Sequence, residues 1–324
     1  MAKPFRFGVM TAGGSTAAEV RDKARKVEAL GYRSLLYNDH YAGPGPAMEA
    51  ANHGPQPVAS IPAVTVSAEV TSTLVVGFRV LAVDYHNPVV LAKELATIDL
   101  LSDGRLEIGL GAGWITSEYE AMGIPMDPPS TRIGRLGEVV DVVRAAMGDG
   151  LVDVHGRYGV DASGFEGTPA PVQRPCPPIA IGGGGRKVLE LAARRADIVA
   201  FNVNNRAGKL GPDGTRESTA DATLEKTGWV REAAGDRFED IELEIGAYFS
   251  AVTDDPKGVA EGLSGFFGLD VADVLDHPHA LIGSVDAICD QLEERRERYG
   301  FSYVTVLDHN AEPFAPVVER MTGK

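Results

Sequence analysis

The chain has 324 residues and a formal net charge of −15, because 46 Asp and Glu outnumber 31 Lys and Arg. Hydrophobic residues make up 44% and charged residues 24%, which excludes a disordered or fibrous chain. So acidic a protein repels phosphate backbones, and we expect no nucleic-acid partner. The sequence has neither a membrane-spanning apolar run nor a signal peptide at its start, so we expect no membrane association and a cytoplasmic location.

Short apolar strands alternate with helical stretches along the chain. The predicted strands are Phe5–Met10, Ser34–Tyr37, Leu74–Val83, Arg105–Leu110, Pro178–Ile181, Ile198–Asn202, Glu242–Ala251 and Tyr303–Leu307. The predicted helices are Thr16–Leu30, Pro88–Leu101, Arg135–Met147 and a stretch that ends near Arg195. Eight strand–helix units predict an α/β fold, a (β/α)8 TIM barrel that occupies residues 1–324 as one domain. The alternative is a doubly wound open sheet.

Three segments are longer than ordinary connections. They are Asp39–Pro57, Gly148–Pro178 and Asn202–Asp221, and the second is expected to form a small hairpin around His155–Arg157. Loops of this length in a compact domain are usually functional. We expect them to cover the mouth of the barrel at the carboxyl ends of the strands, where such barrels carry their active sites.

A run of four glycines is the sharpest local signal. Gly182, Gly183, Gly184 and Gly185 lie between a predicted strand and a helix, followed by Arg186 and Lys187. A glycine loop that opens a helix exposes backbone N–H groups and the positive end of the helix dipole. The run therefore predicts a phosphate-binding loop, and the alternative is a close-packed turn without a ligand.

Two further strand ends carry candidate site residues. The fourth strand runs into Gly111, Ala112, Gly113 and Trp114, where the backbone would pass close to a flat ligand with Trp114 as a wall. The second strand ends in Asp39 and His40, and an imidazole suits proton transfer near neutral pH. The alternatives are loop packing for Trp114 and a surface or capping role for His40.

Other histidines fit structural roles better. Asp308 and His309 follow the last strand but lead directly into the terminal helix, so we favour a structural role for them. His277 and His279 could belong to a metal site, but the sequence offers no third ligand at a suitable spacing. We therefore predict no metal.

The stretch from Asn87 to Trp114, NPVVLAKELATIDLLSDGRLEIGLGAGW, resembles the luciferase-like superfamily of flavin- and deazaflavin-dependent barrels. Similar matches follow in order along the chain: Arg132–Glu138, His155–Tyr158, Pro177–Asp197 and Leu281–Val306. The segment Thr227–Phe238 resembles a narrower subgroup of coenzyme F420-dependent oxidoreductases. Relatives are often dimers, so a homodimer is an open expectation.

The resemblance implies hydride transfer on a cofactor bound in the barrel mouth. It implies that Asp39 contacts the cofactor ring, that His40 moves a proton, and that the ring rests on a bulge at Arg79 and Val80 that often holds a cis peptide bond. Arg79 replaces a glycine of many relatives, and it would either pair with an anionic cofactor or substrate or crowd the ring. The cofactor phosphate would lie at Gly182–Gly185 and near Gly111 and Ala112. The role of Glu118 stays open.

Three functions follow from this reading. The first is an F420-dependent oxidoreductase that acts on a small molecule, either reducing an enone or imine or oxidising an alcohol. The second is an FMN-dependent monooxygenase of the same superfamily. The third is a cofactor-binding barrel without catalysis. The subgroup resemblance and His40 favour the first, and the glutamate tail of F420 would require basic residues near the glycine loop.

Overall fold

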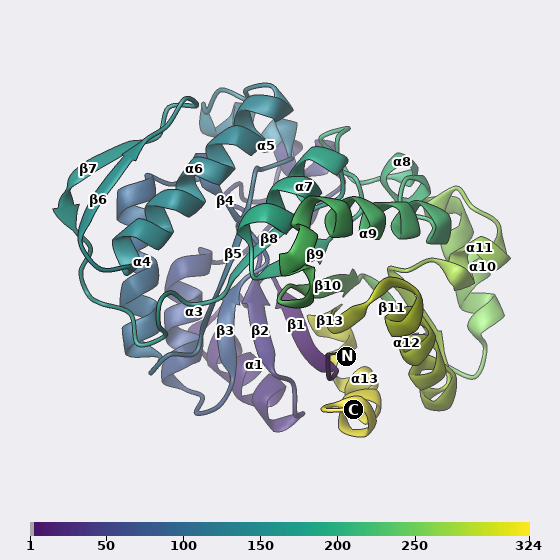
Figure 1. The fold of residues 1–324 in the computed structure, drawn as a ribbon. Coiled ribbons are helices and arrows are strands. Elements are labelled where there is room, and N and C mark those ends of the chain that lie inside the picture. Colours follow the sequence, from purple (N-terminus) through teal and green to yellow (C-terminus); the bar gives the residue numbers. More distant parts are fainter. Residues whose placement is uncertain (1–2) are drawn as a thin grey trace.

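The computed structural model describes residues 3–324, and its centre is a closed barrel of parallel strands surrounded by helices (Figure 1). The barrel strands are β1 (Arg6–Thr11), β2 (Ser34–Tyr37), β3 (Val75–Phe78), β5 (Leu106–Gly111), β8 (Ile179–Gly183), β9 (Ile198–Phe201), β10 (Glu242–Ala247) and β13 (Phe301–Leu307). Each pairs with its neighbours in this order, and β13 pairs with β1. The fold is therefore the predicted TIM barrel, and the open sheet is excluded.

The barrel closes between β3 and β5, where Val76 lies opposite Leu106. The predicted third strand does not run unbroken through this region. It is interrupted after Phe78, and a short strand β4 (Leu81–Ala82) pairs separately with β5. The Arg79–Val80 peptide bond in the interruption is cis, as the resemblance implied. The prediction of one continuous strand was wrong because the apolar pattern continues through the bulge.

The predicted seventh strand is also two strands. β10 stays in the barrel, whereas β11 (Phe249–Val252) pairs with β12 (Ala280–Gly283) in a separate sheet. Helices α10 (Pro256–Phe267) and α11 (Val271–Asp276) pack on this sheet around a small core of their own, beside the barrel (Figure 1). The residues of the predicted strand gave no sign that the chain changes sheet within it.

Some of the helices that surround the barrel begin at polar side-chain caps. Thr16 accepts a hydrogen bond from the Glu19 N–H, and Asn87 caps the helix that starts at Pro88. Their bounds are α1 (Ala17–Ala29), α3 (Ser60–Glu69), α4 (Pro88–Leu101), α6 (Pro129–Met147), α7 (Arg186–Arg195), α9 (Ala220–Ala234), α12 (Val285–Tyr299) and α13 (Ala311–Met321). Helix α6 starts earlier than predicted because its first turn is polar and carries no apolar periodicity.

The long segments carry short elements. They hold α2 (Pro46–Ala50), α8 (Pro212–Arg216) and the hairpin of β6 (Leu151–His155) and β7 (Asp161–Glu166), whereas α5 (Thr116–Met122) follows β5 outside them. The hairpin confirms the prediction and projects from the barrel (Figure 1). Glu138 of α6 holds its turn by accepting a 2.9 Å hydrogen bond from the Tyr158 N–H. Within residues 3–324, no helix has the length and apolarity needed to cross a bilayer.

Candidate active site

A cavity of about 800 Å³ opens at the carboxyl ends of the barrel strands. This volume lies in the range of small-molecule and cofactor sites. All of the predicted site residues line it: Asp39, His40, Arg79, Val80, Gly111, Ala112, Gly113, Trp114, Gly182, Gly183, Gly184, Gly185, Arg186 and Lys187. The fold thus gathers residues from four separate strand ends, and the role of each remains a prediction.

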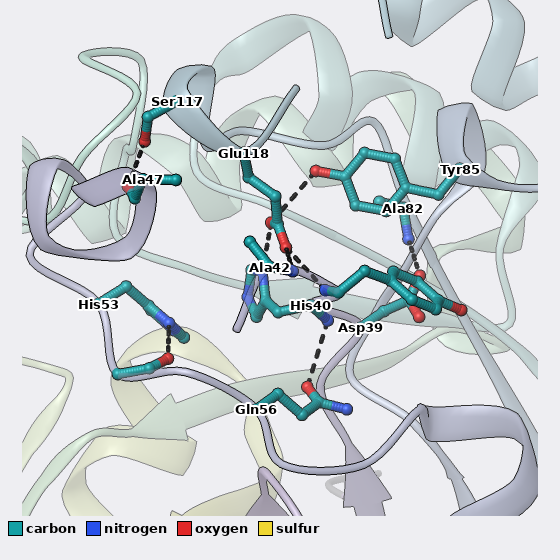
Figure 2. Close-up of polar contacts among 12 residues, drawn as sticks. Asp39, His40, Ala42, Ala47, His53, Gln56, Ala82, Tyr85, Ser117 and Glu118 are labelled. Atoms are coloured by element: carbon teal, nitrogen blue, oxygen red, sulfur yellow. Dashed lines mark hydrogen bonds and ion pairs between the residues drawn. The ribbon is translucent and has the colours of Figure 1, made fainter. Parts of the chain in front are cut away.

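A buried carboxylate holds His40 in place (Figure 2). The Glu118 Oε2 atom lies 2.8 Å from His40 Nδ1. The other oxygen accepts hydrogen bonds from the backbone N–H groups of Tyr41, at 2.7 Å, and Ala42, at 3.1 Å. Tyr85 donates a further bond to Oε2 at 3.3 Å. Because a carboxylate only accepts hydrogen bonds, Nδ1 of His40 carries a proton and Nε2 is left for a ligand.

These contacts set the charge of Glu118. Burial alone would raise the pKa of its carboxyl group. The hydrogen bond and charge of His40, together with the two backbone N–H groups, outweigh burial and lower the pKa. Glu118 is therefore ionised at neutral pH, and its charge lies directly beside the His40 ring. The sequence offered no pattern that assigned this role, because Glu118 lies on α5 and meets His40 only in the folded barrel.

Replacing Glu118 with glutamine should destabilise the protein by about 1–3 kcal/mol at neutral pH, because an amide cannot accept all of these hydrogen bonds. The folded-state pKa lies below the ordinary value of 4.5, so the contribution of the carboxylate is complete above that value. It is lost as the pH falls through the folded-state pKa. Urea unfolding of both proteins at neutral and acidic pH measures the difference. Glu120→Gln, at an exposed position of the same helix, is the control, and a pH-independent difference would contradict this account.

Asp39 is buried and bonds entirely to protein groups among the described residues. Its oxygens accept hydrogen bonds from the Ser60 hydroxyl at 2.8 Å and the Ala82 N–H at 3.0 Å, and one lies 2.8 Å from His86 Nε2. It therefore ties the end of β2 to α3, to β4 and to the segment that precedes α4. Its predicted contact with a cofactor ring stays a prediction.

The Arg79 guanidinium points into the barrel. It lies 2.6 Å from Glu244 Oε2, and both side chains are almost completely buried. Nη2 also donates to the Phe201 carbonyl at 3.3 Å. The charge of Arg79 is thus paired with Glu244. To pair with an anionic ligand as well, Arg79 would have to leave Glu244 or bind both groups.

The glycine loop leads from β8 into α7 at the cavity. A Cβ atom on Gly184 would lie 2.6 Å from the Asn202 carbonyl oxygen, so only glycine fits there. No side chain caps the first turn of α7 among the described residues, which leaves its N-terminal N–H groups toward the cavity. Arg186 is exposed and pairs with Glu190 at 2.7 Å. The arrangement suits an anionic group at the helix N-terminus.

Trp114 forms a wall beside the histidines. Its ring contacts those of His40 and His53 edge-on, at centroid distances of 6.1 and 5.7 Å. His53 lies in the segment between α2 and α3, and nothing in the sequence pattern marked it. Arg132 fixes the preceding backbone by donating to the Ala112 carbonyl at 2.7 Å.

The remaining histidine motifs have structural partners. The Asp308 carboxylate pairs with Lys23 and accepts a 2.7 Å hydrogen bond from the Thr11 hydroxyl. His277 and His279 are buried, and each has a ring nitrogen at a backbone carbonyl oxygen, of Thr215 and Gly246 respectively. These contacts show what holds Asp308, His277 and His279, and the roles of these residues stay predictions.

Residues 1–222 match the luciferase-like monooxygenase family. The chain belongs to this family. Its relatives include an F420-dependent glucose-6-phosphate dehydrogenase from Kribbella flavida, 30% identical over 74% of this chain and 66% of that protein. An FMNH2-dependent dimethylsulfone monooxygenase from Pseudomonas putida is 30% identical over 38% of this chain and 33% of that protein.

The solved structure of another protein has the same fold as this chain. It is the coenzyme F420-dependent tetrahydromethanopterin reductase from Methanopyrus kandleri, with a TM-score of 0.74, 19% identity and coverage of 98% of this chain and 100% of that one. The chain spans between a third and two thirds of the length of the first curated relatives it matches.

Proposed function

We propose that this luciferase-like protein is an oxidoreductase that binds coenzyme F420 in the barrel mouth and acts on a small organic substrate. When bound, F420 accepts a hydride from an alcohol or donates one to an enone or imine. The observation that carries the proposal is His40, held by a buried carboxylate in the same cavity as an open helix N-terminus. The names of the Kribbella flavida and Methanopyrus kandleri relatives support the same cofactor.

The chain's own residues fit such a cofactor in two ways. The N–H groups that begin α7 would hold its phosphate, next to the closely packed Gly182–Gly184. Gly111 lets the strand end pass the bulge, because a Cβ atom there would lie 2.5 Å from Val80 Cγ2. The bulge and the end of β5 thus form a continuous floor at the cavity.

His40 would hold or move the proton of the substrate. Glu118 fixes its Nδ1, so the ring presents Nε2 as the atom that gives or takes a proton. Its side chain is only 11% exposed, which keeps water from competing for that atom. A proton-transfer group of this kind contributes about 10²–10⁴-fold to a rate.

The charge at the cavity rim favours F420 over FMN. Arg186, Lys187 and Arg206 line the same cavity of a protein whose net charge is −15. Arg186 and Arg206 pair with glutamates, whereas the ion pairs among residues 3–324 include none to Lys187. F420 carries a chain of glutamates that these side chains could meet, and FMN carries only a phosphate. The second candidate, an FMN-dependent monooxygenase, is favoured by the Pseudomonas putida relative.

Equilibrium binding tests the choice of cofactor. We expect F420 to bind tightly, F420 without its glutamate tail to bind more weakly, and FMN to bind weakest, with fluorescence as the signal. Replacing Lys187 with serine should weaken F420 binding. The loss should shrink at high salt, because salt screens an exposed contact between Lys187 and the glutamate tail of F420. Lys257→Ser on α10, outside the cavity lining, is the matched control. Tight binding of FMN alone would overturn the proposal.

A further inference from the structure

His53 lies beside the proposed proton carrier and has no part in the mechanism above. Its ring is 4.4 Å from that of His40, centroid to centroid, with an interplanar angle of 50°. Both rings line the cavity and lie close together in Figure 2. A substrate bound at His40 would therefore lie beside a second imidazole.

The tautomer of His53 follows from its one hydrogen bond. Nδ1 lies 2.7 Å from the Gly54 carbonyl oxygen. A carbonyl oxygen only accepts, so Nδ1 carries the proton. Among residues 3–324, no group bonds to Nε2, which is therefore the nitrogen available to a ligand.

The His53 ring is also neutral at physiological pH. Burial and the neighbouring charge of His40 lower its pKa to about 4. A neutral ring with its proton on Nδ1 has a lone pair on Nε2 and no hydrogen to donate there. His53 therefore differs from His40, whose Nδ1 faces the buried Glu118 carboxylate. One ring can move a proton, and the other can only accept a hydrogen bond.

We propose that His53 is a specificity-determining residue that accepts a hydrogen bond from a second hydroxyl group of the substrate, next to the reacting carbon. The inference rests on the proposed function and names its substrate class: vicinal diols and the matching α-hydroxy carbonyl compounds. On oxidation, the C–H hydride passes to F420 and the O–H proton to His40, which leaves a carbonyl group. The second hydroxyl group does not react, so it can bind His53 during both oxidation of the diol and reduction of the hydroxy carbonyl compound.

The lone pair on Nε2 also selects against other compounds. A ketone, ether or ester oxygen in that place has no hydrogen to donate, so its lone pairs would repel the lone pair on Nε2 of His53. A simple alcohol would leave the nitrogen without a partner. Sites that bind a hydroxyl group discriminate against analogues that lack it.

Nitrogen NMR of histidine-labelled protein tests His53 without any cofactor. We expect the Nδ1–H tautomer for His53 at neutral pH. The probe 1,2-propanediol should shift Nε2 of His53 more than 2-propanol does at the same concentration. An Nε2–H tautomer, or equal shifts with both probes, would overturn the inference whether or not F420 binds.

Kinetics with bound F420 give the second test. The preference for 1,2-propanediol over 2-propanol, as a ratio of kcat/KM, should fall about tenfold in His53→Leu, the loss expected for one hydrogen bond. His53→Gln, which keeps an acceptor, should restore most of the preference. An unchanged ratio in His53→Leu would overturn the inference while leaving the proposed function intact. Failure of F420 to bind wild-type protein would instead contradict the proposed function.

Discussion

Replacing His40 with alanine is expected to lower the rate of F420-dependent turnover by about 10²–10⁴-fold. The variant removes the only atom in our account that gives or takes the substrate proton, while the glycine loop and α7 stay in place. F420 should therefore still bind. The initial rate of F420 reduction by an alcohol substrate, measured beside the F420 titration, separates the two effects.

His155→Ala is the control for this substitution. His155 lies on the exposed β6–β7 hairpin, 63% exposed, and pairs with Asp153 and Asp161 outside the cavity. The His155→Ala substitution should leave the rate of F420-dependent turnover unchanged. Equal turnover by wild type and His40→Ala would contradict the proton-transfer role, whereas F420 binding without turnover by either protein would favour the barrel without catalysis.

Replacing Arg79 with methionine is expected to lower the free energy of unfolding by about 3–5 kcal/mol, because it leaves the buried Glu244 without its cation. Burial raises the pKa of the Glu244 carboxyl group even beside Arg79. In the variant, the free energy of unfolding is reduced most at neutral pH, because Glu244 is then ionised and has lost its partner. The loss should shrink as the pH falls and the carboxyl group becomes protonated. Urea unfolding across this range measures it.

Two further variants define the origin of the effect. Arg79→Met combined with Glu244→Leu should recover much of the lost stability, because no unpaired charge remains. Arg25→Met removes an exposed pair with Asp22, at 3.5 Å, and should change the stability by less than about 1 kcal/mol. A loss for Arg79→Met as small as that for Arg25→Met would show that the buried pair does not support the barrel.

The barrel itself could be predicted from sequence because its strands and helices have the regular patterns of their types. Ser34–Tyr37 and Pro88–Leu101 were predicted with their observed bounds. The errors occur where an apolar run continues while the backbone changes course, as at Arg79 and after Ala247. Periodicity reports which residues are apolar, and it does not report where a strand leaves its sheet.

The residues of the candidate site also fall into two groups, those that the sequence could select and those that it could not. Residues at strand ends, such as His40 and Gly184, could be selected because a barrel brings all strand ends to one face. Glu118 and His53 could not. Glu118 meets His40 from a distant segment, and His53 lies in the same long loop, whose path the sequence pattern does not define. The family resemblance placed Asp39 and Arg79 at the site, but only the structure revealed their protein partners.

The most direct test of the central claim is an anaerobic reaction of F420-loaded protein with secondary alcohols and vicinal diols. The absorbance of oxidised F420 reports hydride transfer. We predict that it falls as one carbonyl product forms per F420 reduced, and that His40→Ala slows this loss. Unchanged F420 with every alcohol, together with oxygen consumption by the protein loaded with reduced FMN, would contradict the account and identify an FMN-dependent monooxygenase.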